Sequence, residues 1–204
     1  SARSWQPEAE ILVYDTDTAP SVSAGTENAA QAEVTVSVLG VASIDETGVL
    51  TRSNASVVTR SLTLVREEGR IDAPDNMILI SQAALTASYT LAHLYFPTTD
   101  GTDLVPDPRW YPTRRLASHL LTGLVAGPRP ALETAVSNAI PAGTTLPSHG
   151  VEVADGVARV ELNATMPPGE GARASLAWEL TRTLKQAADV SSVSVSLSGE
   201  SLDM

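Results

Sequence analysis

The chain has 204 residues, 43% of them hydrophobic and 18% charged, and its formal net charge is −11. This composition excludes wholesale disorder, and the length allows one large domain or two small ones. The acidity argues against nucleic acid as a partner, and the absence of cysteine excludes disulfides and thiolate metal sites. No apolar run approaches the roughly 18 residues that a membrane-spanning helix needs.

Residues 1–84 have the pattern of β-strands joined by turns. Short apolar runs, or alternating apolar and polar residues, predict strands at 11–14, 34–38, 62–65 and 77–80.

The segments between these strands are predicted to be turns and one long loop. The polar stretch 15–31 is typical of a long loop, and Gly40 predicts a bulge or a bend. Turns are predicted at 45–48 and 67–70. The result is a curved antiparallel sheet of about four strands without a complete helix to cover it. Because an apolar sheet face needs a second layer, either the second half of the chain packs on it or covering helices lie upstream of Ser1, and the second alternative is favoured.

The rest of the chain, from residue 85 to 204, combines helices and strands into an α+β layer pair in the order β-α-α-β-β-α-β. The predicted elements are a strand at 91–96, helices at 113–126 and 131–140, strands at 151–153 and 157–162, a helix at 172–188 and a strand at 193–197.

Particular residues set the boundaries of these elements. Thr113 is expected to cap the first helix, and Gly127 with the following proline ends it. The segment 104–110 is too rich in proline for a central strand and is expected to be an ordered loop or an edge strand. Asp155 and Gly156 form a strong signal for a two-residue hairpin turn.

No catalytic signature is present in the sequence. The nucleophile elbow, the zinc-protease helix, the phosphate-binding loop and the dinucleotide fingerprint are all missing. His93, His119 and His149 could converge on a metal, but they belong to three different elements and are more economically explained as structural residues. We therefore expect no catalytic residue, no metal and no cofactor.

Three aspartates form another candidate cluster. Asp100, Asp103 and Asp107 lie within eight residues and could hold Ca²⁺ through carboxylate oxygens. The spacing of a calcium-binding loop is missing, so turn-capping is the preferred interpretation.

Asp107 also begins the segment that offers candidate partner-binding residues. Arg109, Trp110 and Tyr111 follow it closely, and a cation beside two aromatic rings is typical of interaction surfaces. The alternative is that Trp110 is buried and anchors a loop. Asp107, Arg109, Trp110 and Tyr111 are accordingly weak candidates for contact with a partner.

The second half of the chain resembles the GerMN domain of the actinobacterial LpqB lipoproteins. The stretches that carry the resemblance are 94–96, 104–110 (Leu-Val-Pro-Asp-Pro-Arg-Trp), 121–128 (Leu-Thr-Gly-Leu-Val-Ala-Gly-Pro), 139–144, 156–162, and Trp178 with 183–184. Residues 1–84 resemble the preceding part of LpqB, which is similar to the NTF2-like fold.

The resemblance implies two domains, an incomplete NTF2-like domain at 1–84 and a GerMN domain at 85–204. It implies a central piece of an extracytoplasmic lipoprotein, held at the cell membrane through a lipid anchor that this stretch lacks. It further implies a non-enzymatic role: binding and modulating the extracytoplasmic domain of a membrane sensor histidine kinase, in an MtrAB-like two-component system that affects envelope homeostasis and division.

Two other hypotheses stay open from the sequence. One is a module that binds peptidoglycan or another envelope component, because NTF2-like cones often enclose a mostly apolar pocket. The other is an enzyme that uses a pair of carboxylates from different elements, which no spacing in the sequence supports.

Overall fold

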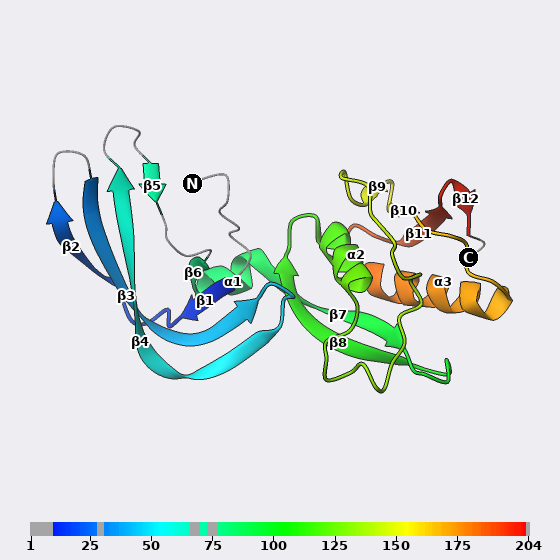
Figure 1. Cartoon of the computed structure of the whole chain (residues 1–204), viewed down its shortest axis with the longest axis horizontal. Coiled ribbons are helices and arrows are strands. Elements are labelled where there is room, and N and C mark those ends of the chain that lie inside the picture. The colour runs from blue at the N-terminus through cyan, green and yellow to red at the C-terminus, as the bar shows by residue number, and fades with distance from the viewer. Residues whose placement is uncertain (1–9, 28–30, 66–69, 73–76, 203–204) are drawn as a thin grey trace. The chain divides into compact units, whose positions relative to one another are not determined.

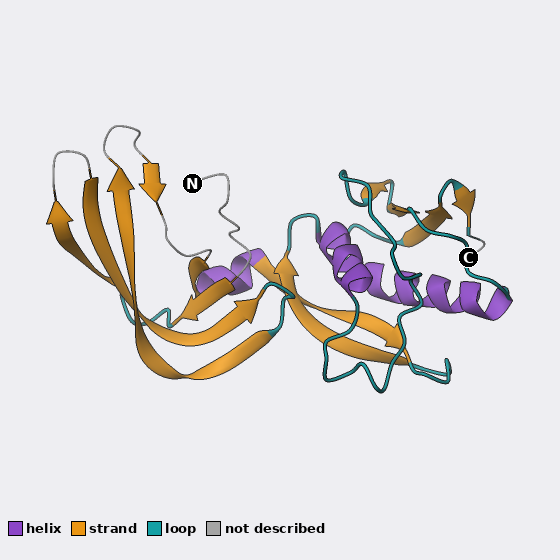
Figure 2. Ribbon diagram, viewed as in Figure 1, coloured by secondary structure: helices purple, strands orange, loops and turns teal. Residues whose placement is uncertain are grey.

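A computed structural model describes residues 10–27, 31–65, 70–72 and 77–202 of the chain. The chain divides into two compact units, residues 1–89 and residues 90–204, and each is described by itself. Both combine strands and helices, so the fold class is α+β, as the sequence predicted (Figures 1 and 2).

The first unit is built on one sheet. Its elements are β1 (Glu10–Tyr14), β2 (Ser21–Glu27), β3 (Gln31–Asp45), β4 (Leu50–Val65), β5 (Arg70–Asp72), β6 (Met77–Ser81) and the helix α1 (Gln82–Ser88).

The long strand β3 organises this sheet. It pairs with β4 along one edge, while β1 and β2 follow one another along its other edge (Figure 1). Its register shifts between Gly40 and Ala42, which confirms the predicted bulge. Ile11, Val13 and Ile44 are buried together with Leu85 of α1, so this short helix covers the part of the sheet next to β1.

Two predictions for this unit are wrong. The stretch 15–31 is not one loop, because β2 lies within it and pairs with β3. The edge of the long strand β3 offers unpaired backbone N–H and C=O groups to which a polar segment can bond, and the polarity of the segment itself does not predict this pairing. The sheet is also not wholly antiparallel, because β6 runs parallel to β1. The predicted turn at 67–70 and the helices expected upstream lie outside the described residues.

The second unit places two helices against two small sheets (Figures 1 and 2). Its elements are β7 (Tyr89–Pro97), β8 (Leu104–Pro112), α2 (Leu116–Ala126), β9 (Glu152–Ala154), β10 (Val157–Leu162), α3 (Glu170–Leu184), β11 (Ser192–Leu197) and β12 (Glu200–Ser201).

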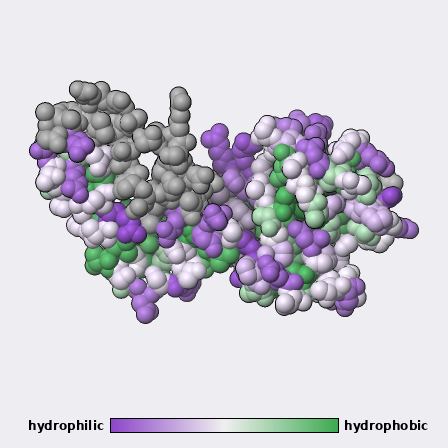
Figure 3. Space-filling model, in the orientation of Figure 1, coloured by the Kyte–Doolittle hydropathy of each residue, from purple (hydrophilic) through white to green (hydrophobic). Residues whose placement is uncertain are grey.

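One core joins these elements. Buried side chains from β7, α2, α3, β10 and β11 belong to the same cluster, among them Phe96, Leu120, Leu180 and Val160. The larger sheet has the order β12-β11-β10-β9, and the smaller one pairs β7 with β8. On the face of this unit drawn in Figure 3, hydrophilic and hydrophobic residues are intermixed.

The hairpin between β9 and β10 is confirmed. Asp155 and Gly156 have φ of 53° and 77°, the left-handed pair that a two-residue turn of this kind requires. A Cβ added at Gly156 would lie 2.6 Å from the Ser191 hydroxyl, so glycine is also needed here for space.

The helix predicted at 131–140 is absent, which makes the predicted element order wrong at this point. The segment forms turns and an isolated bridge between Thr98 and Val136. Two of its backbone N–H groups bond to tertiary partners, Ser137 to the Pro97 carbonyl and Ala139 to Glu179, while Ala135 and Val136 bond locally to Leu132. The spacing of four residues did identify inward positions, because Val136 and Ile140 are buried.

Of two boundary predictions for the second unit, the edge strand at 104–110 is confirmed and the helix cap at Thr113 is wrong. The proline-rich segment 104–110 lies within the strand β8 of the two-stranded sheet, where each strand has a free edge that tolerates proline. Thr113 does not cap α2. Its hydroxyl instead pairs with that of Thr90 at 2.8 Å, and the capping position falls on Arg115, which has φ 57°.

Candidate functional site

The predicted partner-binding segment lies on β8, and the alternation of this strand separates its four residues. Asp107, Arg109 and Tyr111 share one face of the strand: Asp107 and Arg109 are buried, with 0% and 3% of their surface exposed, and Tyr111 is half-buried. Trp110 is also half-buried but lies on the opposite face. An exposed patch made of all four residues is therefore the wrong picture, because a strand sends alternate side chains to opposite faces.

Asp107 forms the centre of a buried ion-pair cluster. Its Oδ2 accepts hydrogen bonds from Arg109 Nη2 at 2.7 Å and from the backbone N–H of Arg129 at 3.2 Å. The Arg129 Nε lies 3.2 Å from Oδ1, outside hydrogen-bond geometry, and completes an ion pair. The cluster fastens the segment that follows α2 to β8, so these charges hold the unit together.

Tyr111 packs against α2 instead of standing free. Its ring stacks on His119 with centroids 6.2 Å apart and planes inclined by 13°. Its hydroxyl fills the space beside Gly123, where an added Cβ would overlap it.

A second buried carboxylate lies on α3. Glu179 is fully buried, and its Oε2 accepts a hydrogen bond from the backbone N–H of Ala139 at 2.9 Å. Oε1 has no hydrogen-bond partner among the described residues. Burial raises the pKa of Glu179 to about 8, while the bond from Ala139 acts in the opposite direction. At neutral pH this side chain is therefore largely protonated.

The remaining titratable candidates have separate structural roles. Asp100 accepts hydrogen bonds from the hydroxyls of Thr98 and Thr102, and the Thr98 bond is the main reason why the pKa of Asp100 lies below its ordinary value. Asp100 thus caps a turn, whereas Asp107 belongs to the interior cluster described above. Among the described residues, no group of three or more histidine and acidic side chains is arranged to hold a metal ion.

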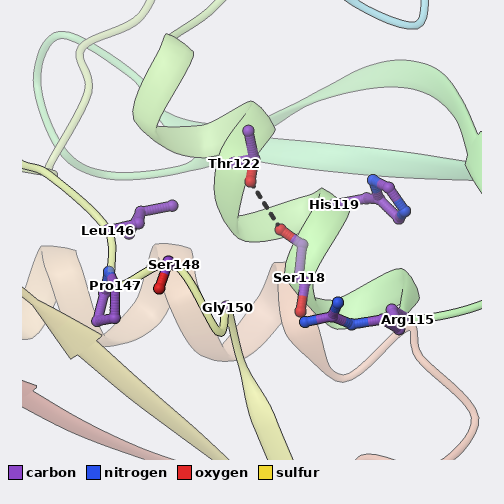
Figure 4. A pocket seen from close by; sticks show the side chains of 8 residues that line it. All are labelled: Arg115, Ser118, His119, Thr122, Leu146, Pro147, Ser148 and Gly150. Carbon is purple, nitrogen blue, oxygen red and sulfur yellow. Dashed lines mark hydrogen bonds between the residues drawn. The ribbon is translucent and has the colours of Figure 1, made fainter. Parts of the chain in front are cut away.

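A pocket of about 210 Å³ opens between α2 and the loop before β9 (Figure 4). It is lined by Arg115, Ser118, His119, Thr122, Leu146, Pro147, Ser148 and Gly150. In the close-up, Ser118 and Thr122 project from the helix beside the loop, and the Arg115 side chain extends along the lower edge.

Hydrogen bonds fix the walls of this pocket. Ser118 Oγ accepts from the backbone N–H of Val151 at 3.0 Å, and an Arg115 guanidinium nitrogen donates to the carbonyl oxygen of His149. A Cβ at Gly150 would lie 2.7 Å from Ser118 Oγ, so this glycine permits the close approach of loop and helix. The pocket cannot be predicted from the sequence, because its two walls are about thirty residues apart along the chain. In the sequence, Gly150 is the one residue that could have indicated a close approach of the loop to the helix.

Two family descriptions match the chain. "Lipoprotein LpqB, N-terminal domain" matches residues 1–86, and "Sporulation and spore germination", the Germane family, matches residues 93–203. Neither description names a reaction. Within the described residues, no helix is both long enough and apolar enough to cross a membrane.

Curated relatives align with nearly the whole chain. Lipoprotein LpqB of Thermobifida fusca is 31% identical over 216 residues, covering 98% of this chain and 33% of that protein. Lipoprotein LpqB of Cutibacterium acnes is 28% identical over 206 residues, covering 98% of this chain and 34% of that protein. The chain thus spans about a third of the length of these relatives.

One solved structure is also similar. The tandem GerMN domains of the sporulation protein GerM from Bacillus subtilis share 22% identity with a TM-score of 0.41, covering 56% of this chain and 41% of that one. Taken together, the two family matches in their order along the chain, and the relatives that align with both, show that this chain belongs to the lipoprotein LpqB family and carries an LpqB N-terminal domain followed by a Germane (GerMN) domain.

Proposed function

We propose that this chain is a non-enzymatic module of a lipid-anchored, extracytoplasmic lipoprotein that binds the extracytoplasmic domain of a sensor histidine kinase. Binding would modulate the kinase of an MtrAB-like two-component system and so affect envelope homeostasis and division. The observation that carries the proposal is membership of the LpqB family, through an alignment that covers 98% of the chain.

The chemistry of the buried acidic groups supports a binding role. Asp107 is neutralised by two arginines, and Glu179 is bonded to a backbone N–H in the core. Each of these carboxylates therefore fastens one segment of the fold to another. Neither faces an open cavity in the way that a general acid or base must do to reach a substrate.

A direct binding measurement tests this proposal. The chain is immobilised, and the isolated extracytoplasmic domain of the kinase from the same organism is passed over it in increasing concentration. We expect saturable binding that also appears as a crosslinked pair in solution. If a chain shown to be folded by circular dichroism captures no more kinase domain than an unrelated acidic protein does, the proposal is wrong.

Binding of an envelope component is the second candidate function, and the pocket beside α2 favours it. The pocket offers hydroxyls from Ser118, Thr122 and Ser148 next to the apolar side chain of Leu146, a mixture that suits a peptidoglycan fragment. A soluble muropeptide should raise the melting temperature, because a ligand that binds the native state stabilises it. Thr122→Trp, which fills the pocket with an indole, should abolish the shift. An unchanged melting temperature at millimolar muropeptide would exclude this candidate.

A further inference from the structure

The outward face of α3 carries a cationic and aromatic stripe made of Trp178, Arg182 and Lys185, which we call the α3 stripe. Residues three and four apart lie on one face of a helix, so the three side chains form a row. All three are exposed, and Trp178 keeps 42% of its surface accessible. Lys185 is the single lysine of the chain.

The charge of the α3 stripe opposes that of the whole chain. The helix contains two acidic residues, Glu170 at its first position and Glu179, whose side chain is fully buried. The last two turns, which hold the α3 stripe, therefore present no exposed carboxylate. The outward face is therefore positive, on a chain with a formal net charge of −11. A local reversal of sign of this kind is able to select an acidic surface and to set its orientation.

Arg182 is held in place by the neighbouring strand. Its guanidinium lies 4.9 Å from the centroid of the Tyr95 ring on β7. The backbone N–H of Tyr95 donates to the Thr183 hydroxyl at 3.1 Å, which fixes β7 to α3 at this point. An arginine stacked on a ring still has N–H donors at the edge of its plane, which suit a carboxylate, and less side-chain freedom is lost when it binds.

We propose that the α3 stripe docks an acidic segment of the kinase's extracytoplasmic domain, with carboxylates on Arg182 and Lys185 and an apolar side chain against Trp178. The identity of the partner rests on the proposed function, whereas the surface and its chemistry come from the structure. Tryptophan, tyrosine and arginine are the residues that most often dominate binding at protein interfaces. A second copy of the chain and an anionic membrane are both repelled by the net charge of −11, so a partner protein is the favoured occupant.

Charge-matched variants test this surface. Arg182→Glu and Arg159→Glu each change the net charge by the same amount. Arg159 is exposed on β10, between the buried residues Ala158 and Val160, and therefore lies on the sheet face opposite the core. We expect Arg182→Glu and Trp178→Ala each to weaken binding of the kinase domain at least tenfold, and Arg159→Glu to change it less than twofold. Circular dichroism and the melting temperature verify that each variant is folded.

Each result separates this inference from the proposed function. If the unchanged chain binds and the two α3 stripe variants bind equally well, the docking surface is wrong while the proposed function stands. If the unchanged chain does not bind the kinase domain, both the proposed function and the docking surface are wrong. Two further measurements test the other occupants. Binding to vesicles rich in phosphatidylglycerol tests an anionic membrane, and the mass from light scattering tests a second copy of the chain. If Arg182→Glu loses vesicle binding or dimer formation but still binds the kinase domain, the inference is also wrong.

Discussion

The Glu179 carboxylate on α3 holds Ala139, forty positions earlier in the chain, through a hydrogen bond of 2.9 Å to its backbone N–H. This bond fastens the irregular segment after α2 to the helix that forms the centre of the core. Because Oε1 is buried without a hydrogen-bond partner among the described residues, the protonated form of the carboxyl is the more stable one inside the fold.

The pH dependence of unfolding is the first prediction. The pKa of Glu179 rises from an ordinary value of 4.5 to about 8 in the folded chain. Between these values the folded state keeps a proton that the unfolded state releases, so this group lowers the free energy of unfolding as pH rises, by roughly 5 kcal/mol in total. Urea unfolding of the chain and of Glu179→Gln, from pH 5 to 9, should show this decline in the unchanged chain alone. If the free energy of unfolding changes with pH in the same way in both proteins, the raised pKa of Glu179 is wrong.

Loss of the buried carboxylate at Asp107 should destabilise the fold strongly. Asp107→Asn removes the negative charge between Arg109 and Arg129, and breaking a buried ion pair by removing one of its charges costs about 3–5 kcal/mol. The exposed pair of Arg159 and Glu152, 3.5 Å apart, provides the control: Arg159→Ala should cost less than about 0.5 kcal/mol. Chemical denaturation of both variants measures the difference. Equal denaturation midpoints for the two variants would show that the buried Asp107 cluster stabilises the fold no more than the exposed pair does.

A glycine inside α2 should resist a substitution that helices normally favour. Gly123→Ala would ordinarily stabilise a helix by about 0.5–1 kcal/mol, but here the new methyl group overlaps the Tyr111 hydroxyl. We expect a net loss of about 1–3 kcal/mol from overpacking. Tyr111→Phe should recover part of that loss, since it removes the overlapping oxygen. If the double variant is as unstable as the sum of the two single ones, the steric explanation is wrong.

The outer edge of β7 should open locally when its side-chain partners are removed. Gln186 accepts from the backbone N–H of His93 at 2.9 Å and donates to the His93 carbonyl oxygen at 2.6 Å, while Thr183 accepts from Tyr95. Gln186→Ala should speed hydrogen exchange of the His93 amide about fivefold to tenfold, as expected for the loss of about 1 kcal/mol, and leave that of Tyr95 nearly unchanged.

The reciprocal variant provides the control for this edge. Thr183→Val should expose the Tyr95 amide and spare that of His93, because each side chain serves one residue of the strand. Exchange rates measured by NMR resolve the two amides. Equal acceleration of both in either variant would mean that the strand edge opens as one unit.

Local pattern determined much of the secondary structure. The hairpin at 155–156 follows from two residues that accept left-handed backbone, and the leucine stripe of α2 follows from helical spacing. The same kind of signal identified the inward positions Val136 and Ile140, although their segment is not a helix. The spacing of apolar residues thus predicts which side chains are buried more reliably than it predicts whether the backbone is a helix.

The sequence by itself determined the α+β class, the bulge at Gly40 and, through its motifs, the family. Tertiary structure alone decided that Asp107 and Arg109 neutralise each other in the interior, that Glu179 replaces a helical hydrogen bond at Ala139, and that Arg182 stacks on Tyr95. The physical reason is distance along the chain. Propensity and spacing act over a few residues, whereas the charge state, burial and exposure of a side chain depend on neighbours that folding brings from distant parts of the chain. Arg129, 22 residues from Asp107, completes the ion-pair cluster, and Glu179 lies 40 residues from Ala139.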